Sequence, residues 1–357
     1  MARSASSTSG CSRAAVRRAG EQPVSIAVEA SAIPGAAAIA RTGPMIQVEN
    51  LGRRFGDTWA IRGLDFTLAA GEVFGLLGPN GAGKTTTVRM LTSLIAPSEG
   101  RASVDGFDVV TSPEAVRSRI GLLTETPGLY ERLTALQNLD FFGRLHGLSA
   151  DVRADRIERL LKLFELWDRR NEQTGTFSKG MKQKLAIART LLHDPTVLFF
   201  DEPTSGLDPE AAFIVREAIS NLKSTGRTIV LCTHNLDEAE RLCDRVAFVR
   251  GQVLRIDSPA RLRTSAGTTS VAVTLAEAVA PALLGAVRAL PGVRSVDGAN
   301  DELRIVVENA RRDTPLLIRT LAASGADVLG VTAATATLES VYFDVMGVKP
   351  PTDGVGI

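Results

Sequence analysis

The residues best suited to chemistry form a glycine-rich run that ends in a lysine and two threonines: Gly78, Pro79, Asn80, Gly81, Ala82, Gly83, Lys84, Thr85 and Thr86. The run fits the pattern G-x-x-x-x-G-K-[ST] and lies between a predicted strand and a predicted helix. Glycines let backbone N–H groups turn inward around phosphate oxygens at the positive end of a helix. We therefore expect a phosphate site, with Lys84 on the terminal phosphates and the Thr85 hydroxyl on Mg²⁺.

Two carboxylates follow a short apolar run farther along the chain. Residues 197–200 predict a buried strand, and Asp201 and Glu202 come directly after it. Ligands of open α/β sheets bind at the carboxyl ends of the strands. We expect Asp201 to hold Mg²⁺ and Glu202 to position and activate an attacking water molecule. A plain acidic turn is the alternative.

Strands are predicted on both sides of these motifs. Residues 46–51 alternate apolar and polar, residues 59–68 continue as strand, and residues 71–77 form a buried strand that runs into the glycine-rich turn. Residues 197–200 and 228–232 are further buried runs with a helix between them. Buried strands separated by helices are typical of a parallel α/β sheet.

A helical insert is expected at about residues 112–180. Ser112 precedes Pro113, Thr134 and Gln137 have the spacing of a capping box, and Ser149 precedes apolar residues at helical intervals. Each pattern predicts the start of a helix.

The chain changes in character after Pro259. Residues 270–275, 293–296, 303–307 and 327–332 read as strands, and residues 277–290 and 311–324 as helices. The order βαββαβ predicts a small ferredoxin-like α+β domain. We assign residues 259–346 to this accessory domain, including a final helix at 338–346, and residues 347–357 to a tail.

Composition excludes several classes of protein. The 357 residues carry 41 Lys and Arg against 40 Asp and Glu, a net charge of +1, which argues against a nucleic-acid partner. Three cysteines without a C-x-x-C pair argue against disulfides or a zinc site. No run approaches the ~20 apolar residues of a transmembrane helix, so work at a membrane would need another chain.

Residues 1–44 differ from the rest, with five arginines against two glutamates. A disordered leader or an over-extended start, with Met45 near the true beginning, is the main interpretation. A targeting peptide is the alternative.

Residues 176–183 resemble the signature segment of the ATP-binding subunits of ABC transporters. The signature positions are Ser178, Lys179, Gly180 and Met181. The usual form is Leu-Ser-Gly-Gly-Gln, from which Phe177, Lys179 and Met181 depart, while Ser178 and Gly180 are retained. The resemblance implies that this loop binds the γ-phosphate of ATP held by another subunit.

Further segments match that family in order. Ser205, Gly206, Leu207 and Asp208 resemble the D-loop, where Asp208 could also cap a helix. His234 resembles the switch histidine that contacts the γ-phosphate, and Phe55 the aromatic residue that stacks on adenine, with a core position as its alternative. Glu125 aligns with the Q-loop but replaces its usual glutamine, and a solvated loop carboxylate is the alternative there.

The resemblance implies a P-loop NTPase of ABC type over residues 45–258, with a parallel-sheet core, an antiparallel β subdomain and the helical insert. It implies that ATP and Mg²⁺ are the cofactors. It also implies that the nucleotide-binding domains form a head-to-tail homodimer and that a separate membrane permease is the partner. By this resemblance, the catalytic residues would be Glu202, His234 and Lys84. The protein would be cytoplasmic and bound peripherally to the inner face of the cell membrane. Drug-resistance exporters of the daunorubicin type are most similar; a translation or repair ATPase is the alternative.

Overall fold

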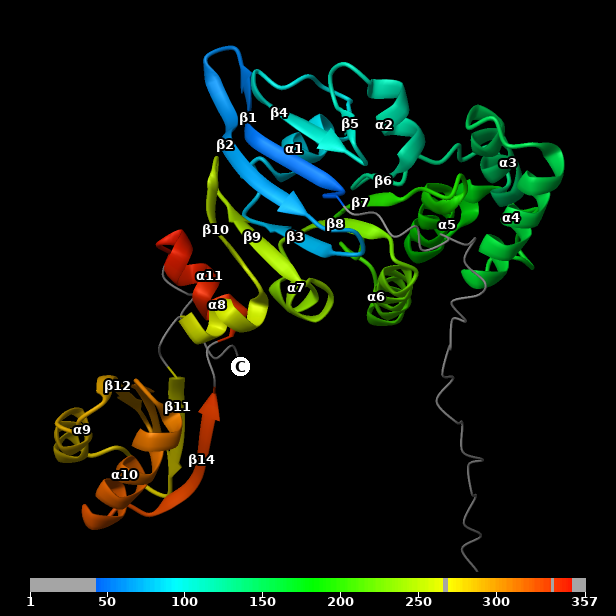
Figure 1. Ribbon diagram of the computed structural model, residues 1–357. Coiled ribbons are helices and arrows are strands. Elements are labelled where there is room, and N and C mark those ends of the chain that lie inside the picture. Colours follow the sequence, from blue (N-terminus) through cyan, green and yellow to red (C-terminus); the bar gives the residue numbers. More distant parts are fainter. Residues whose placement is uncertain (1–42, 266–268, 335–336, 349–357) are drawn as a thin grey trace, which may run out of the picture.

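The computed structural model describes residues 43–265, 269–334 and 337–348, so almost all of the leader and most of the tail lie outside the described residues. An antiparallel sheet of order β2-β1-β4-β5 comes first (Figure 1). Its strands are β1 (Ile46–Phe55), β2 (Thr58–Leu68), β4 (Glu99–Val104) and β5 (Phe107–Asp108). This is the antiparallel subdomain that the family resemblance implied.

The central sheet has the order β10-β9-β3-β8-β7-β6. Its strands are β3 (Val73–Leu77), β6 (Ile120–Leu123), β7 (Val197–Asp201), β8 (Thr228–Thr233), β9 (Arg245–Val249) and β10 (Val253–Asp257). All neighbours are parallel except β10, which runs antiparallel to β9. The predicted parallel α/β core is thus confirmed.

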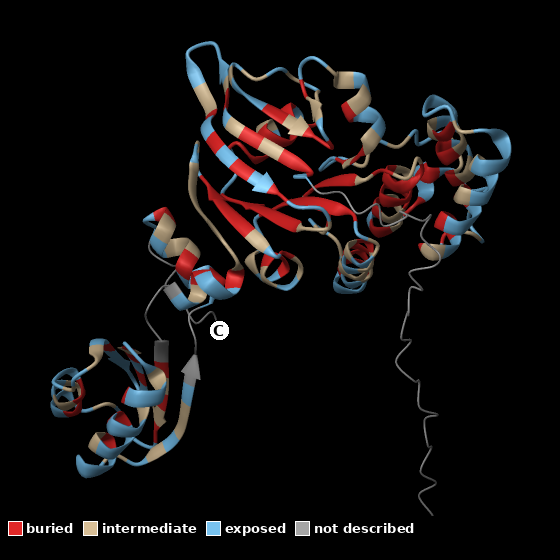
Figure 2. Cartoon of the chain, viewed as in Figure 1, coloured by how far each residue is buried: buried red, intermediate tan, exposed pale blue. Residues whose placement is uncertain are grey.

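Burial on both faces explains why the central strands read as continuous apolar runs. In β7, Val197 and Phe199 face one hydrophobic cluster, while Leu198 and Phe200 face the other. Figure 2 shows these strands as buried along their length. Helices cover one face and the antiparallel sheet with α1 covers the other, so neither face is left to polar residues.

The helices of this unit begin largely where the caps predict. They are α1 (Lys84–Leu91), α2 (Pro113–Arg119), α3 (Ala135–Leu145), α4 (Ala150–Leu163), α5 (Lys179–Leu191), α6 (Pro209–Ser224), α7 (Leu236–Leu242) and α8 (Pro259–Ser265), with a 3₁₀ turn at Thr174–Thr176. The capping box of Thr134 and Gln137 has both of its hydrogen bonds. Ser112 and Ser149 precede α2 and α4 without a side-chain capping bond.

Strand β6 corrects the expectation that residues 112–180 are all helical. Its four residues pair in parallel with β7 at the end of the central sheet. So short an apolar run cannot be distinguished from a helical segment by periodicity. The pairing partner, which is remote in sequence, decides its structure.

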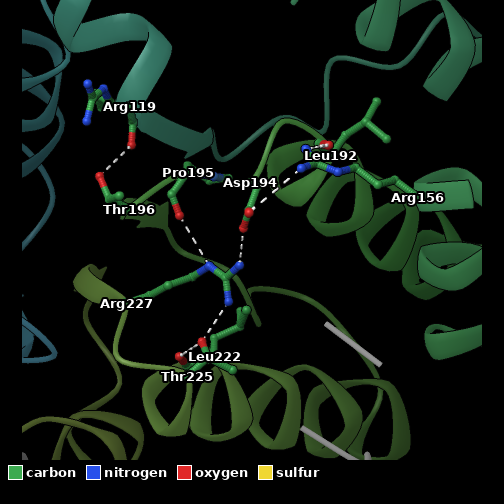
Figure 3. Close-up of polar contacts among 9 residues, drawn as sticks. All are labelled: Arg119, Arg156, Leu192, Asp194, Pro195, Thr196, Leu222, Thr225 and Arg227. Carbon is green, nitrogen blue, oxygen red and sulfur yellow. Dashed lines mark hydrogen bonds and ion pairs between the residues drawn. The ribbon is translucent and has the colours of Figure 1, made fainter. Parts of the chain in front are cut away.

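A buried arginine joins the central sheet to the helical insert (Figure 3). The Arg227 guanidinium donates hydrogen bonds to the Asp194 carboxylate, the Pro195 carbonyl and the Thr225 hydroxyl, and its side chain has no exposed surface. Asp194 also lies 3.8 Å from Arg156 of α4. The Asp194 carboxylate therefore pairs with Arg227 of the core and with Arg156 of the helical insert.

The third sheet lies beyond α8. It contains β11 (Thr269–Leu275), β12 (Val293–Ala299), β13 (Glu302–Val307) and β14 (Val328–Ala334) in the order β12-β13-β11-β14, all antiparallel. Helices α9 (Pro281–Arg288) and α10 (Ala310–Ala323) pack on this sheet around their own hydrophobic cluster. The predicted βαββαβ order and ferredoxin-like fold are confirmed.

The packing of α8 and α11 (Leu338–Met346) departs from the expectation that residues 259–346 form one accessory unit. Leu262 of α8 and Leu338 of α11 belong to the hydrophobic cluster under the central sheet. The Tyr342 ring meets the Phe248 ring edge-on at 5.6 Å between centroids. Helix α11 also contacts α7 (Figure 1). Both helices therefore belong to the core, and the third sheet is inserted between them.

Candidate nucleotide site

A cleft of about 590 Å³ lies at the carboxyl ends of β3, β7 and β8. It collects residues from segments that are far apart in the sequence: Phe55, Ala60, Pro79, Asn80, Gly81, Ala82, Gly83, Lys84, Thr85, Thr86, Glu125, Asp201, Glu202, Ser205 and His234. Gly78 supports the cleft through its carbonyl group, which accepts a hydrogen bond from Lys84 Nζ at 2.6 Å.

The backbone of the glycine-rich loop explains its composition. Gly83 caps α1 with a φ of +102°, in the left-handed region that favours glycine. A Cβ atom there would lie 2.8 Å from the carbonyl oxygen of Ala60, so only glycine fits. Lys84 follows at the first position of α1 and also reaches the Pro79 carbonyl at 3.2 Å. Its ammonium group is thus held over the loop where phosphates would sit.

Thr85 and Asp201 meet across the cleft. The Thr85 hydroxyl donates a hydrogen bond of 2.9 Å to Asp201 Oδ2. Burial raises the pKa of Asp201, the bond from Thr85 opposes that shift, and the charges of Glu202 and Glu125 add to it. A nearby cation would therefore relieve the accumulated negative charge.

These oxygens fit a magnesium ion. Mg²⁺ prefers hard oxygen ligands and is usually held by one or two carboxylates together with substrate phosphates. Asp201 supplies a carboxylate and Thr85 a hydroxyl side by side, next to the phosphate loop. Among the described residues, no group of three or more His, Cys, Asp or Glu could hold a metal without such help.

Glu202 and His234 form the second polar pair of the cleft. His234 Nδ1 lies 2.9 Å from Glu202 Oε2. The Glu202 backbone has a φ of +52°, which is unusual for a residue with a side chain. Its N–H donates to the Cys232 carbonyl of β8, which anchors the turn to the neighbouring strand.

Phe55 and Glu125 are two further predicted residues that line the cleft. Phe55 ends β1 with 48% of its surface exposed, which contradicts a core position. The Arg53 guanidinium lies 4.8 Å from the centre of the Phe55 ring. Glu125 follows β6 and faces the cleft, where its charge reaches Asp201.

The signature segment lies outside the cleft. Ser178 caps α5 by accepting a hydrogen bond from the Met181 N–H, and Asp208 caps α6 in the same way from Ala211. Gly180 packs so closely on Ala211 that an added Cβ would lie 2.9 Å from it. The signature thus adjoins the D-loop, of which Ser205 alone lines the cleft.

Sequence reasoning missed two buried polar residues that contact the Glu202 turn. Gln183 of α5 donates a hydrogen bond of 2.7 Å to the Pro203 carbonyl. Glu238 of α7 accepts one of 2.9 Å from the Thr204 hydroxyl. Both long side chains are buried. A polar residue on the inner face of a helix was the available signal, but nothing in the sequence names its partner.

A glycine-rich loop between a buried strand and a helix, facing an acidic pair at the end of another parallel strand of the same sheet, defines a P-loop nucleotide-hydrolysing protein. The comparison with known families agrees, because residues 61–205 match the ABC transporter family. The chain is 48% identical over 217 residues to the ABC transporter ATP-binding protein NatA of Bacillus subtilis (strain 168), covering 59% of this chain and 88% of that protein.

A second relative extends the similarity beyond the nucleotide core. The daunorubicin resistance ATP-binding protein DrrA3 of Streptomyces coeruleorubidus is 39% identical over 303 residues, covering 85% of this chain and 96% of that protein. A solved dimeric ATP-binding cassette, in a post-hydrolysis state with ADP and Pi, aligns with a TM-score of 0.55 and 26% identity over 60% of this chain and 98% of that one.

The chain therefore belongs to the family of ABC transporter ATP-binding proteins, and it is an ATPase that binds ATP. These relatives favour the transporter interpretation over a translation or repair factor. Within the described ranges, no helix is long and apolar enough to cross a membrane.

Proposed function

We propose that this chain pairs head to tail with a second copy and drives a separate membrane permease that exports a drug-like or hydrophobic compound. The observation that carries the proposal is the separation of the cleft from the signature segment. Lys84 lines the cleft, whereas Ser178 and Gly180 lie outside it beside the D-loop. A second copy would supply the missing signature.

Six of the residues that line the cleft have roles in this scheme. Lys84 binds the terminal phosphates, and Phe55 offers an exposed ring for adenine. Bound Mg²⁺, held by Thr85 and Asp201, would neutralise charge on the phosphates. Glu202 takes a proton from the attacking water at Oε1, because Oε2 is engaged by His234. His234 also reaches the developing charge on the γ-phosphate.

The movement that closes the dimer would be transmitted to the permease through the helical insert and the Glu125 loop. The export of a drug-like compound is supported by the similarity to the daunorubicin resistance protein, which extends over most of the chain. In this scheme, the chain is a peripheral subunit on the inner face of the membrane, bound there by the permease.

Two measurements test the proposal on the full chain. The purified protein should hydrolyse ATP, and co-expression with a candidate permease should yield a complex from detergent-solubilised membranes. A variant with Glu202→Gln serves as the inactive control for hydrolysis. Failure to hydrolyse ATP would contradict the catalytic roles, and co-purification with ribosomes instead of the permease would contradict the transport role.

A further inference from the structure

The turn that carries Glu202 is held in an unusual backbone conformation. Glu202 has a φ of +52°, and left-handed residues with side chains persist only where the surrounding structure holds them. The turn continues through a hydrogen bond from the Ser205 N–H to the Glu202 carbonyl at 3.2 Å. The next backbone bond, from the Leu207 N–H to the Thr204 carbonyl, is also 3.2 Å.

Glu238, a buried residue of helix α7, forms a hydrogen bond with this turn. Glu238 Oε1 accepts the hydrogen bond of the Thr204 hydroxyl at 2.9 Å, and Glu238 has 1% of its surface exposed. Its second oxygen is buried without a hydrogen-bond partner among the described residues. Burial raises the pKa of Glu238, hydrogen bonding to the side chains of Thr233 and Thr204 opposes that shift, and the charge of Glu202 adds to it. A carboxylate so costly to bury depends on these polar contacts.

The same glutamate is tied to the loop of His234. Asn235, the residue after His234, caps α7 by accepting a hydrogen bond of 3.0 Å from the Glu238 N–H. Glu238 thus touches the Glu202 turn with its side chain and the His234 loop with its backbone. The two loops supply the two members of the 2.9 Å pair in the cleft.

We propose that Glu238 is a positioning residue for ATP hydrolysis, which acts by holding the turn of Glu202 through Thr204 and keeping it in register with the loop of His234. This role rests on the proposed function of Glu202. It predicts that loss of the Thr204–Glu238 bond slows the chemical step without weakening ATP binding, because the glycine-rich loop follows β3 whereas the Glu202 turn follows β7.

Matched variants of the full chain test the role. Thr204→Val, which keeps the shape and removes the hydroxyl, should lower kcat between about tenfold and about a hundredfold. The ATP concentration that gives half-maximal protection against thermal unfolding should not change in this variant. Thr204→Ser, which restores the hydroxyl, should recover most of kcat. Thr190→Val removes another buried hydroxyl, which donates to the Ala186 carbonyl within α5 and to the Leu122 carbonyl of β6, and should leave kcat unchanged.

A second readout needs no nucleotide. Hydrogen–deuterium exchange of the Ser205 and Leu207 amides should quicken about tenfold or more in Thr204→Val, because the turn opens more often. In the double variant Thr204→Val/Glu238→Ala, the fall in kcat should be much smaller than the product of the single effects, since either change breaks the same bond.

The inference would be overturned by an unchanged kcat and unchanged exchange in Thr204→Val, or by effects that multiply in the double variant. A fall in ATP affinity without a fall in kcat would also overturn it. If the unaltered chain hydrolysed no ATP, the proposed function would fail, whereas the exchange measurement would still test the bond itself.

Discussion

His234 Nδ1 lies 2.9 Å from Glu202 Oε2, although the two residues belong to loops that follow different strands of the central sheet. β7 and β8 are parallel neighbours, so their carboxyl ends lie side by side and their loops meet. The base of the proposed hydrolysis and the group that orients it are therefore brought together by strand order.

Replacing Glu202 by glutamine should stop hydrolysis while keeping the shape of the cleft. We expect kcat to fall about a hundredfold or more, since the amide cannot accept the proton of water. ATP should stay bound and favour a stable dimer, which size-exclusion chromatography with ATP would detect. Glu158→Gln, which alters an exposed ion pair of α4, is the control. Unchanged hydrolysis in Glu202→Gln would refute the role of Glu202.

Removing the lysine of the phosphate loop should abolish protection by nucleotide. Lys84→Ala deletes a buried ammonium group, and charged hydrogen bonds of this kind contribute about 1.5–3 kcal/mol each. Thermal unfolding with increasing ATP measures the effect. Lys162→Ala, at an exposed position of α4, should keep full protection. Equal protection in both variants would count against the phosphate site.

Glu125→Gln should increase the affinity for ATP when Mg²⁺ is chelated. The change removes a negative charge that faces the cleft, and for an exposed group the gain should be at most about fivefold. High salt should reduce the difference through screening. Glu131→Gln alters a neighbouring exposed carboxylate that is paired with Lys182, and should have little effect. A loss of affinity in Glu125→Gln would contradict this prediction.

Asp194→Ala should be among the most destabilising changes in the core. It leaves the fully buried Arg227 guanidinium without its carboxylate, which costs about 3–5 kcal/mol. Asp155→Ala breaks an ion pair that is half exposed on both sides and should cost less than about 1 kcal/mol. Urea denaturation of the two variants compares them, and similar losses would show that the Arg227 contact adds nothing.

Leu338→Ala should test the docking of α11. Leu338 is fully buried in the core cluster, and such truncations cost about 2–5 kcal/mol. Leu329 of β14 is 71% exposed, so Leu329→Ala provides a matched control with little expected effect. The melting temperature should fall only for Leu338→Ala. A helix that merely lay on the surface would tolerate both changes equally.

Local patterns in the sequence determined much of this protein. Residues within a few positions of one another define the glycine-rich loop and the acidic pair at the end of β7. The same is true of the helix caps at Thr134, Ser178 and Asp208. The same holds for the βαββαβ order, because periodicity and turn residues mark each element separately.

The tertiary structure alone decided what depends on distant partners. β6 is a strand because it pairs with β7. Helix α11 belongs to the core because Tyr342 packs against Phe248 and Leu338 lies in the core cluster. The hydrogen bond between Thr204 and Glu238 joins the turn before α6 to helix α7, and no sequence spacing predicts that contact. Such contacts arise when the chain folds back on itself, and a buried polar group finds its partner only in that packed arrangement.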